Sequence, residues 1–296
     1  MYILDPVTHE TIWGGNRIIK NDNIHKIGHL YLVNGNKGLS NIILNGRFKG
    51  KKLEDVFPII KDEMNVSEYD TFPLTIAIVD ATKNLSIQVH PDDMAARELE
   101  GKKVGKEESW LFLQAPKNGW IYAGCECGSR DEVKNAVVDG KMEEITTHFS
   151  MDEDGYVCVQ PGTLHAMTAG SLVFEIEYGS DYTYRFFDYN RVDEQGNARE
   201  LHIEKALKAI RFDTSLRKKY LTNNKWQREQ NYELCVYEGI NKYRNESDRI
   251  ECLSIIKGSG LVEGCWLHDY MSVIMLPDEE ISKVDCEKII VTRLVK

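Results

Sequence analysis

The chain has 296 residues, of which 42% are hydrophobic and 28% charged, the composition of a soluble globular protein with one large or two modest domains. This composition excludes a largely disordered chain. The formal net charge of −10, from 47 acidic and 37 basic residues, argues against an extended nucleic-acid interface, because a phosphate backbone requires a basic surface. One or two well-placed Lys or Arg side chains would still suffice for a small anionic substrate.

The sequence carries no recognisable targeting or membrane signal. The N-terminal residues lack a basic start followed by an apolar core, and no segment approaches the run of about 18 apolar residues that spans a bilayer. We therefore expect a cytoplasmic protein without membrane contact. The seven cysteines are an odd number without paired C-x-x-C spacing, which predicts reduced thiols and not a disulfide framework.

The first 64 residues predict short strands, turns and one interrupted helix. Extended pieces are expected at TIWGGNRI, HLYLV and LSNIIL. The doubled glycine at Gly14 and Gly15 predicts a tight turn. Residues 51–64 have a helical pattern that Pro58 interrupts.

A buried strand expected at residues 73–80 leads into the stretch LSIQVHPDD. In an extended strand, Ile87 and Val89 face one side, whereas Gln88 and His90 face the other. The proline that follows ends the strand, and the two aspartates after it suit the first turn of a short helix. One face of this strand is therefore apolar and the other can carry chemistry.

The segment KEESWLFLQA predicts the next strand, with Glu108, Trp110 and Phe112 on one face. A carboxylate among aromatic rings is costly to leave unpaired. Glu108 is therefore expected to be solvated at the end of the strand or bound to a cation or metal.

Further along, a helical and acidic region at 130–145 precedes a strand, a Pro161-Gly162 turn, His165 and a second strand. An amphipathic helix is expected from about residue 201 to 220, as a connector to a last region of strands. In that last region, residues 258–260 (Gly-Ser-Gly) predict a turn. Many short strands separated by glycine turns indicate a mainly β sandwich or barrel.

Four residues in these strands and turns form a candidate metal site: Gln88, His90, Glu108 and His165. Two imidazoles, a carboxylate and an amide oxygen suit Zn²⁺, and Mn²⁺, Fe²⁺ and Co²⁺ are also compatible. The alternative is that they are structural or solvent-exposed residues, which is the usual role of scattered histidines.

Several segments, in this order along the chain, resemble class I mannose-6-phosphate isomerases in their short bacterial form. They are ETIWGG, IQVHPDD, the Lys106–Trp110 segment, VQPGTLHAM, SDYTYRFFDYNR, RELHIEKAL and, near the C-terminus, SVIMLP. The resemblance implies a mainly β cupin fold (a double-stranded β-helix, or jelly roll) with a small helical insertion and a second, smaller cupin-like β domain. We accordingly expect a catalytic metal-binding domain at residues 1–220 and a C-terminal β domain at 221–296.

The resemblance also implies roles for individual residues. It implies one Zn²⁺ per chain held by the four candidate ligands, and it makes Lys106 and Arg185 active-site residues. Asp181, Glu177 and Trp13 are implied to lie at the substrate pocket. Without the family context, the charged residues among these would be interpreted as solvated surface groups.

Two departures from the family pattern add negative charge. Glu177-Tyr178-Gly179 stands where the family usually has a glutamine followed by serines, and Glu107 follows Lys106. An anionic substrate gains nothing from added carboxylates, so these changes bear on which sugar the protein accepts.

The function implied by the resemblance is interconversion of mannose 6-phosphate and fructose 6-phosphate through an enediol. The proton carrier stays open among Lys106, a metal-bound water and a carboxylate such as Glu177. The alternatives are an isomerase or epimerase acting on another, possibly unphosphorylated, sugar, and a cupin that binds a sugar phosphate without turnover. The expected partner is a small sugar phosphate, with no nucleic acid and no membrane, and the expected state is a monomer or homodimer.

Overall fold

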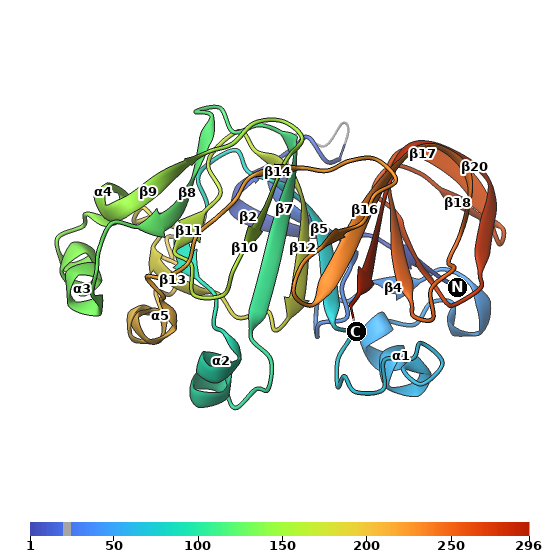
Figure 1. Cartoon of the computed structure of the whole chain (residues 1–296), viewed down its shortest axis with the longest axis horizontal. Coiled ribbons are helices and arrows are strands. Elements are labelled where there is room, and N and C mark those ends of the chain that lie inside the picture. Colours follow the sequence, from blue (N-terminus) through green and yellow to red (C-terminus); the bar gives the residue numbers. More distant parts are fainter. Residues whose placement is uncertain (20–24, 296) are drawn as a thin grey trace. The chain divides into compact units, whose positions relative to one another are not determined.

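The computed structural model describes residues 1–19 and 25–295, and it is mainly β, as predicted (Figure 1). The chain divides into two compact units. The central unit comprises Glu10–His29 and Val79–Tyr220, and the terminal unit comprises Met1–His9, Leu30–Ile78 and Leu221–Lys296. The described strands form three sheets, two of which carry the candidate site.

The first sheet follows the order β13-β6-β11-β8-β9. Helices line one side of it in Figure 1, and together with it they enclose one hydrophobic core. The strands and helices are β6 (Ile87–Val89), β8 (Trp120–Cys125), β9 (Thr146–Ser150), β11 (His165–Ala166), β13 (Tyr184–Phe187), α3 (Arg130–Val138), α4 (Met142–Ile145) and α5 (Ile203–Ala209).

The second sheet follows the order β14-β10-β7-β12-β5-β3-β2. A short helix, α2 (Asp93–Glu100), follows β6 in the chain and precedes β7. The strands are β2 (Val7–Gly15), β3 (Ile27–Val33), β5 (Leu74–Asp80), β7 (Lys106–Gln114), β10 (Gly155–Val159), β12 (Leu172–Gly179) and β14 (Lys219–Tyr220). The pairing of β7 with β12 and β10 is antiparallel, and it sets the register of the site.

The third sheet follows the order β15-β16-β20-β17-β19-β1-β4, with β18 paired to β17. Its own apolar core includes Leu253, Val273 and Ile289. The elements are β1 (Tyr2–Asp5), β4 (Ile42–Ile43), η1 (Gly46–Phe48), α1 (Leu53–Ile60), β15 (Gln227–Arg228), β16 (Tyr232–Arg244), β17 (Glu251–Val262), β18 (Cys265–Leu267), β19 (Ser272–Met275) and β20 (Glu280–Leu294).

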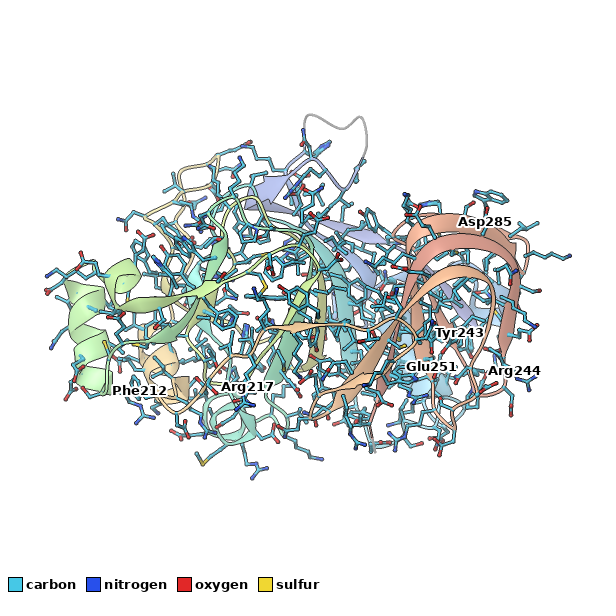
Figure 2. All side chains as sticks on the ribbon, turned by 45° about the horizontal axis from the view of Figure 1, so that its top comes forward. Phe212, Arg217, Tyr243, Arg244, Glu251 and Asp285 are labelled. Carbon is cyan, nitrogen blue, oxygen red and sulfur yellow. The ribbon has the colours of Figure 1, made fainter. Side chains whose placement is uncertain are left out.

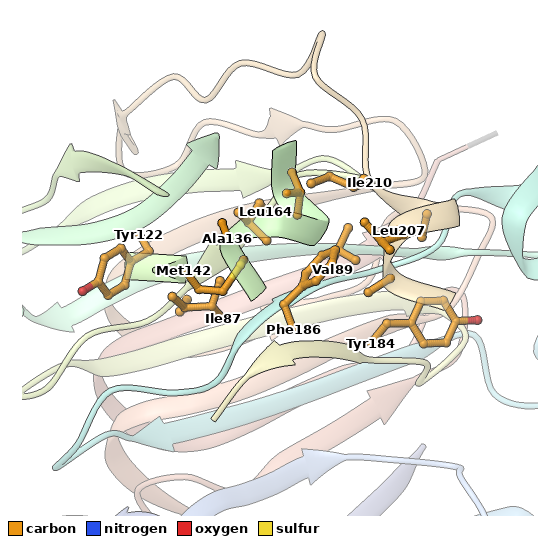
Figure 3. Packing of buried hydrophobic residues seen from close by; sticks show 14 of the residues in the cluster. Ile87, Val89, Tyr122, Ala136, Met142, Leu164, Tyr184, Phe186, Leu207 and Ile210 are labelled. Carbon is orange, nitrogen blue, oxygen red and sulfur yellow. The ribbon is translucent and has the colours of Figure 1, made fainter. Parts of the chain in front are cut away.

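The core of the first sheet explains why the site lies on its other face. Ile87 and Val89 of β6 pack with Tyr184 and Phe186 of β13 and with residues of α3 and α5 (Figure 3). Because side chains alternate along a strand, Gln88 and Arg185 point away from this core. The alternation expected at residues 87–90 is therefore what the structure shows.

The connector helix expected at about 201–220 is much shorter than predicted. Helix α5 ends at Ala209, and Ile210 has an extended backbone with ψ 139°. The predicted apolar positions do enter the core, but after Ile210 the chain bonds elsewhere: Arg211 N–H donates to Gly162 O at 2.8 Å. Residues 219 and 220 then form strand β14, so tertiary hydrogen bonds override the helical pattern there.

Two glycine-rich segments predicted as turns lie within or at the end of strands. Gly258 has φ 142°, and the register of β17 against β20 shifts beside it, which describes a bulge. A Cβ at Gly258 would lie 2.5 Å from Cys286 Cα. Gly14 and Gly15 end β2, where a Cβ would lie 2.5 Å from Gly28 N and 2.3 Å from the Asp80 carboxylate. Close approach of neighbouring groups, not chain reversal, requires glycine at these positions.

Three other expectations can be set against the structure. The seven cysteines are all free thiols in the described part of the chain. Among the described residues, no helix has both the length and the apolar character needed to cross a bilayer. The predicted domains 1–220 and 221–296 stay a prediction, and the two compact units also divide after Tyr220 but group residues 1–9 and 30–78 with the C-terminal strands.

Candidate metal and substrate site

The site begins where β6 ends. His90 follows the strand directly, and Asp92 caps α2 by accepting a hydrogen bond from Ala95 N–H at 2.8 Å. Gly162 N–H of the Pro161-Gly162 turn donates to His90 O at 2.8 Å. This hydrogen bond ties the end of β6 to the turn that precedes β11.

Three of the predicted metal ligands converge on one point inside the central unit. His90 Nε2 lies 3.0 Å from Glu108 Oε2, and His165 Nε2 lies 3.1 Å from Glu108 Oε1. The ring centroids of the two histidines are 4.8 Å apart, and all three side chains are buried. This group of His90, Glu108 and His165, together with Gln88, is called the metal centre below.

The outer ring nitrogen of each histidine is held by the backbone. His90 Nδ1 lies 2.9 Å from Tyr182 O, and His165 Nδ1 lies 2.8 Å from Thr163 O. A carbonyl only accepts, so each Nδ1 carries the proton and each Nε2 presents a lone pair to the centre. Burial lowers the pKa of His90 to about 4, which keeps this ring neutral.

The inner atoms of the centre have no partner of the ordinary kind. Within the described residues, His90 Nε2, His165 Nε2 and Glu108 Oε1 are buried without a hydrogen bond. Buried polar atoms are rarely left so, and three that converge within 4.8 Å of one another fit a bound divalent cation. The residues present therefore fit a divalent metal ion.

Gln88 stands next to this group by register. Residues Arg185, Gln88 and His165 are paired across β13, β6 and β11, so the three share a face of the sheet. Gln88 Oε1 accepts a hydrogen bond from Ser86 Oγ at 2.9 Å. This contact orients the amide on the same side of the strand as Ser86 and His90.

Lys106 connects the metal centre to one further carboxylate, that of Glu177. Its Nζ lies 3.2 Å from Glu108 Oε2 and 2.6 Å from Glu177 Oε1. Burial lowers the pKa of Lys106, but Glu177, Glu108 and Glu175 outweigh that effect and raise it. The pairs Glu177↔Glu108 and Gly179↔Lys106 in the register of β12 against β7 bring these groups together.

Glu175 belongs to the same cluster and was not among the predicted site residues. Its Oε1 accepts a hydrogen bond from Trp110 Nε1 at 2.9 Å, and its carboxylate lies with those of Glu108 and Glu177. Burial and the neighbouring Glu177 raise the pKa of Glu175 well above its usual range. Burial and Glu108 likewise raise the pKa of Glu177, against the effect of Lys106. The alternation of β12, which puts Glu175 on the face of Glu177, was the sequence signal that could have identified it.

The remaining predicted residues surround this cluster at different depths. Trp13 is buried, and its ring lies edge-on to that of His29, with the ring centroids 5.1 Å apart. His29 Nε2 in turn lies 3.9 Å from Glu175 Oε2. Asp181 is exposed on the loop between β12 and β13, whose Tyr182 O holds His90. Trp13 therefore lies behind the carboxylates, and Asp181 lies at the surface.

Arg185 is a cation with Asp188 and Glu200 among its charged neighbours. It is half-buried on β13, and its Nε is buried without a hydrogen-bond partner among the described residues. Burial and the neighbouring Arg199 lower its pKa. Such a group is suited to bind an anionic ligand oxygen.

The two departures from the family pattern differ in their placement. Glu177 points into the cluster, whereas Glu107 lies on the opposite face of β7, where its Oε1 accepts from Cys158 Sγ at 3.7 Å. The extra acid at position 107 therefore lies away from the metal centre.

Known proteins share both sequence and fold with this chain. Residues 1–118 match the model of the type I phosphomannose isomerase catalytic domain. The "probable mannose-6-phosphate isomerase GmuF" of Bacillus subtilis (strain 168) is 33% identical over 211 residues, which cover 70% of this chain and 67% of that protein. YvyI of the same organism, with the same activity in its name, is 30% identical over 283 residues, 88% of this chain and 86% of that protein.

A solved structure agrees with these matches. The crystal structure of the mannose 6-phosphate isomerase from Bacillus subtilis has a TM-score of 0.84 and 28% identity, and the match covers 99% of each chain. The expected mainly β cupin fold is thereby confirmed. Identity of 30% or more across most of a relative's length, together with this structural match, shows common descent. The chain belongs to the type I phosphomannose isomerase family.

Proposed function

We propose that the protein is a metal-dependent aldose–ketose isomerase that interconverts mannose 6-phosphate and fructose 6-phosphate. The single observation that carries this proposal is the convergence of unpartnered His90, His165 and Glu108 atoms directly beside the ammonium of Lys106. An aldose–ketose isomerisation needs proton transfer and stabilisation of an enediolate, and such a pairing of a cation site with an acid–base group supplies both.

Zn²⁺ is the proposed ion, held by His90, Glu108, His165 and Gln88. Neutral imidazole and carboxylate ligands suit it, and a set with only protein nitrogen and oxygen donors also admits Mn²⁺ or Co²⁺. When bound, the ion supplies Lewis-acid stabilisation of negative charge on sugar oxygens. One ion per chain is expected.

The residues around the metal centre would carry out proton transfer, stabilisation of the enediol oxyanion and binding of the phosphate. Lys106, between Glu108 and Glu177, is placed to stabilise the oxyanion of an enediol or to donate a proton to it. Either Glu175 or Glu177 would carry the proton between the two carbons, since both carboxylates lie within the cluster. Arg185 would bind the phosphate or the enediolate, because its buried Nε has no hydrogen-bond partner among the described residues.

The decisive experiment combines metal analysis with a coupled assay on purified protein. We expect about one divalent ion per chain and turnover of mannose 6-phosphate that a chelator removes and added Zn²⁺ restores. Glu175→Gln and Glu177→Gln, which keep size and remove the carboxylate, would identify the proton carrier by the larger loss in kcat.

Two results would contradict this proposal. Absence of turnover in metal-loaded protein would support binding without catalysis. Preference for free mannose over its phosphate would leave a sugar isomerase of different specificity, as the extra carboxylate of Glu177 would suggest.

A further inference from the structure

Strand β13, which carries Arg185, is an edge strand of its sheet. The described strands follow the order β13-β6-β11-β8-β9, so β13 pairs only with β6 on one side. Arg185 is paired with Gln88, and the register slips between Arg185 and Phe187. Arg185 therefore pairs with β6 directly beside a register shift. The backbone N–H and C=O groups of β13 that point away from β6 need other partners.

His202 supplies both of these partners at Arg185. Arg185 N–H donates to His202 Nδ1 at 3.3 Å, and His202 N–H donates to Arg185 O at 2.8 Å. In an antiparallel strand the N–H and C=O of one residue point to the same side, so a neighbouring strand would normally take both. Here a single residue takes the place of that strand.

His202 is itself held in place by the core. It precedes α5, and its C=O accepts from Ala206 N–H at 2.8 Å. Ala206 and Leu207 of α5 pack in the same cluster as Tyr184 and Phe186, the residues on either side of Arg185 (Figure 3). His202 therefore connects a well-packed helix to the backbone of Arg185.

The imidazole of His202 is in the correct state for this contact. Burial and the neighbouring Arg185 lower its pKa, which leaves Nδ1 free to accept a hydrogen bond near neutral pH. The other nitrogen, Nε2, lies 3.8 Å from Glu200 Oε2 near the surface. With the proton on Nε2, the lone pair on Nδ1 accepts from Arg185 N–H while Nε2–H faces the Glu200 carboxylate.

We propose that His202 is a positioning residue for Arg185, which clamps the backbone of β13 so that the guanidinium faces the substrate. The Nε of the guanidinium has no hydrogen-bond partner among the described residues, so the position of the guanidinium depends on the position of its backbone. This inference rests on the proposed function, because it concerns how Arg185 meets substrate. It assigns to His202 no contact with substrate or metal.

The test compares His202→Ala with His202→Asn, whose side-chain oxygen can accept at the position of Nδ1. We expect His202→Ala to lower kcat/KM for mannose 6-phosphate about tenfold with the metal content unchanged, since displacement of a binding group by a fraction of an ångström weakens catalysis. His202→Asn should restore most of this loss. Lys208→Gln, on the helix α5 that follows His202, is the matched control, because it removes only an exposed ion pair with Glu98, and it should leave the activity unchanged.

A double-mutant cycle separates positioning from a general effect on the fold. If His202 acts through Arg185, then His202→Ala should cost less than about twofold when Arg185 is already lysine. A loss of equal size in both backgrounds would overturn the proposal.

Hydrogen exchange of the backbone gives a readout that does not depend on activity. His202→Ala should speed exchange of the Arg185 amide, and His202→Asn should retain its protection. If only the amides of α5 lose protection, His202 serves the helix alone and the proposal is wrong. Absence of isomerase activity in the wild-type protein would instead refute the proposed function, whatever the exchange at Arg185 shows.

Discussion

The metal centre and a second buried charged group, in the terminal unit, differ in whether their buried polar and charged atoms have partners within the chain. In the terminal unit, Glu251 is buried and accepts from Tyr243 O–H at 2.6 Å and from Arg293 Nη1 at 3.0 Å (Figure 2). Arg293 Nε donates to Glu233 at 2.7 Å, and its guanidinium stacks on Trp226 at 3.8 Å. These charges are satisfied by the chain itself.

The metal centre leaves three buried polar atoms without a hydrogen bond within the described residues. Glu108 is equally buried, yet its Oε1 and the facing nitrogens of His90 and His165 have no hydrogen bond within the described residues. Burying a polar atom without a partner costs about 1–3 kcal/mol of folding free energy. A closed network serves stability, and an open one is retained where a ligand completes it. We therefore expect mutations in the closed network of the terminal unit to alter stability. Mutations at the metal centre should instead alter metal binding and turnover.

The largest effect is expected at a metal ligand. His165→Ala removes one of the two imidazoles and should abolish stoichiometric metal binding, with a loss of activity of about a thousandfold, since electrostatic stabilisation of this kind is worth about 10²–10³ per group. Elemental analysis and the coupled assay measure both. His148→Ala, an exposed histidine on β9 of the same sheet, is the control. Full metal content in the His165→Ala protein would show that His165 is not a metal ligand.

The next effect is expected at Lys106, which touches the centre without being a proposed ligand. Lys106→Met keeps the length of the side chain and should retain the metal while kcat falls about a hundredfold, because a positioned proton donor or cation is lost. Lys102→Met, at an exposed position, should have no such effect. Unchanged turnover would remove Lys106 from the mechanism.

A smaller effect is expected at Arg185. Arg185→Lys keeps the charge but loses the planar pair of donors, which should cost about 2 kcal/mol of transition-state binding, or about thirtyfold in kcat/KM. The loss should be greater for mannose 6-phosphate than for free mannose if the contact is phosphate, and similar for both if it is the enediolate. Arg217→Lys, at an exposed position labelled in Figure 2, is the control. An unaffected kcat/KM would show that the guanidinium contacts neither.

The smallest effect is expected in the closed network of the terminal unit. Tyr243→Phe removes one hydrogen bond to a buried carboxylate and should lower the free energy of unfolding by about 1.5 kcal/mol, with metal content and kcat/KM unchanged. Thermal and denaturant unfolding measure the change. Arg244→Gln, which breaks an exposed ion pair to Asp278, should change stability by less than about 0.5 kcal/mol. A loss of activity in Tyr243→Phe without a loss of stability would contradict the division between the two groups.

The faces of the strands that carry the site could be predicted from local sequence patterns. Alternation separated Ile87 and Val89 from Gln88, and it placed Glu108 beside Trp110, as the structure shows. Local patterns suffice for this because the two faces of a strand depend only on its own backbone. Several segments that resemble one family, in order along the chain, then indicated that family, and the comparisons with known proteins confirm it.

Which distant residues meet could not be predicted from local patterns and depends on strand pairing. The register of β12 against β7 places Glu177 and Glu175 beside Glu108, and Glu175 was missed because nothing local to β12 specifies its partner strand. The early end of α5 and the bulge at Gly258 have the same origin, since the helical pattern and the glycines are local signals that contacts with other segments override. The reciprocal hydrogen bonds between His202 and Arg185 likewise exist only because α5 packs on the core beside β13. Faces are set by short-range backbone geometry, whereas register and pairing are set by packing between segments far apart in the chain.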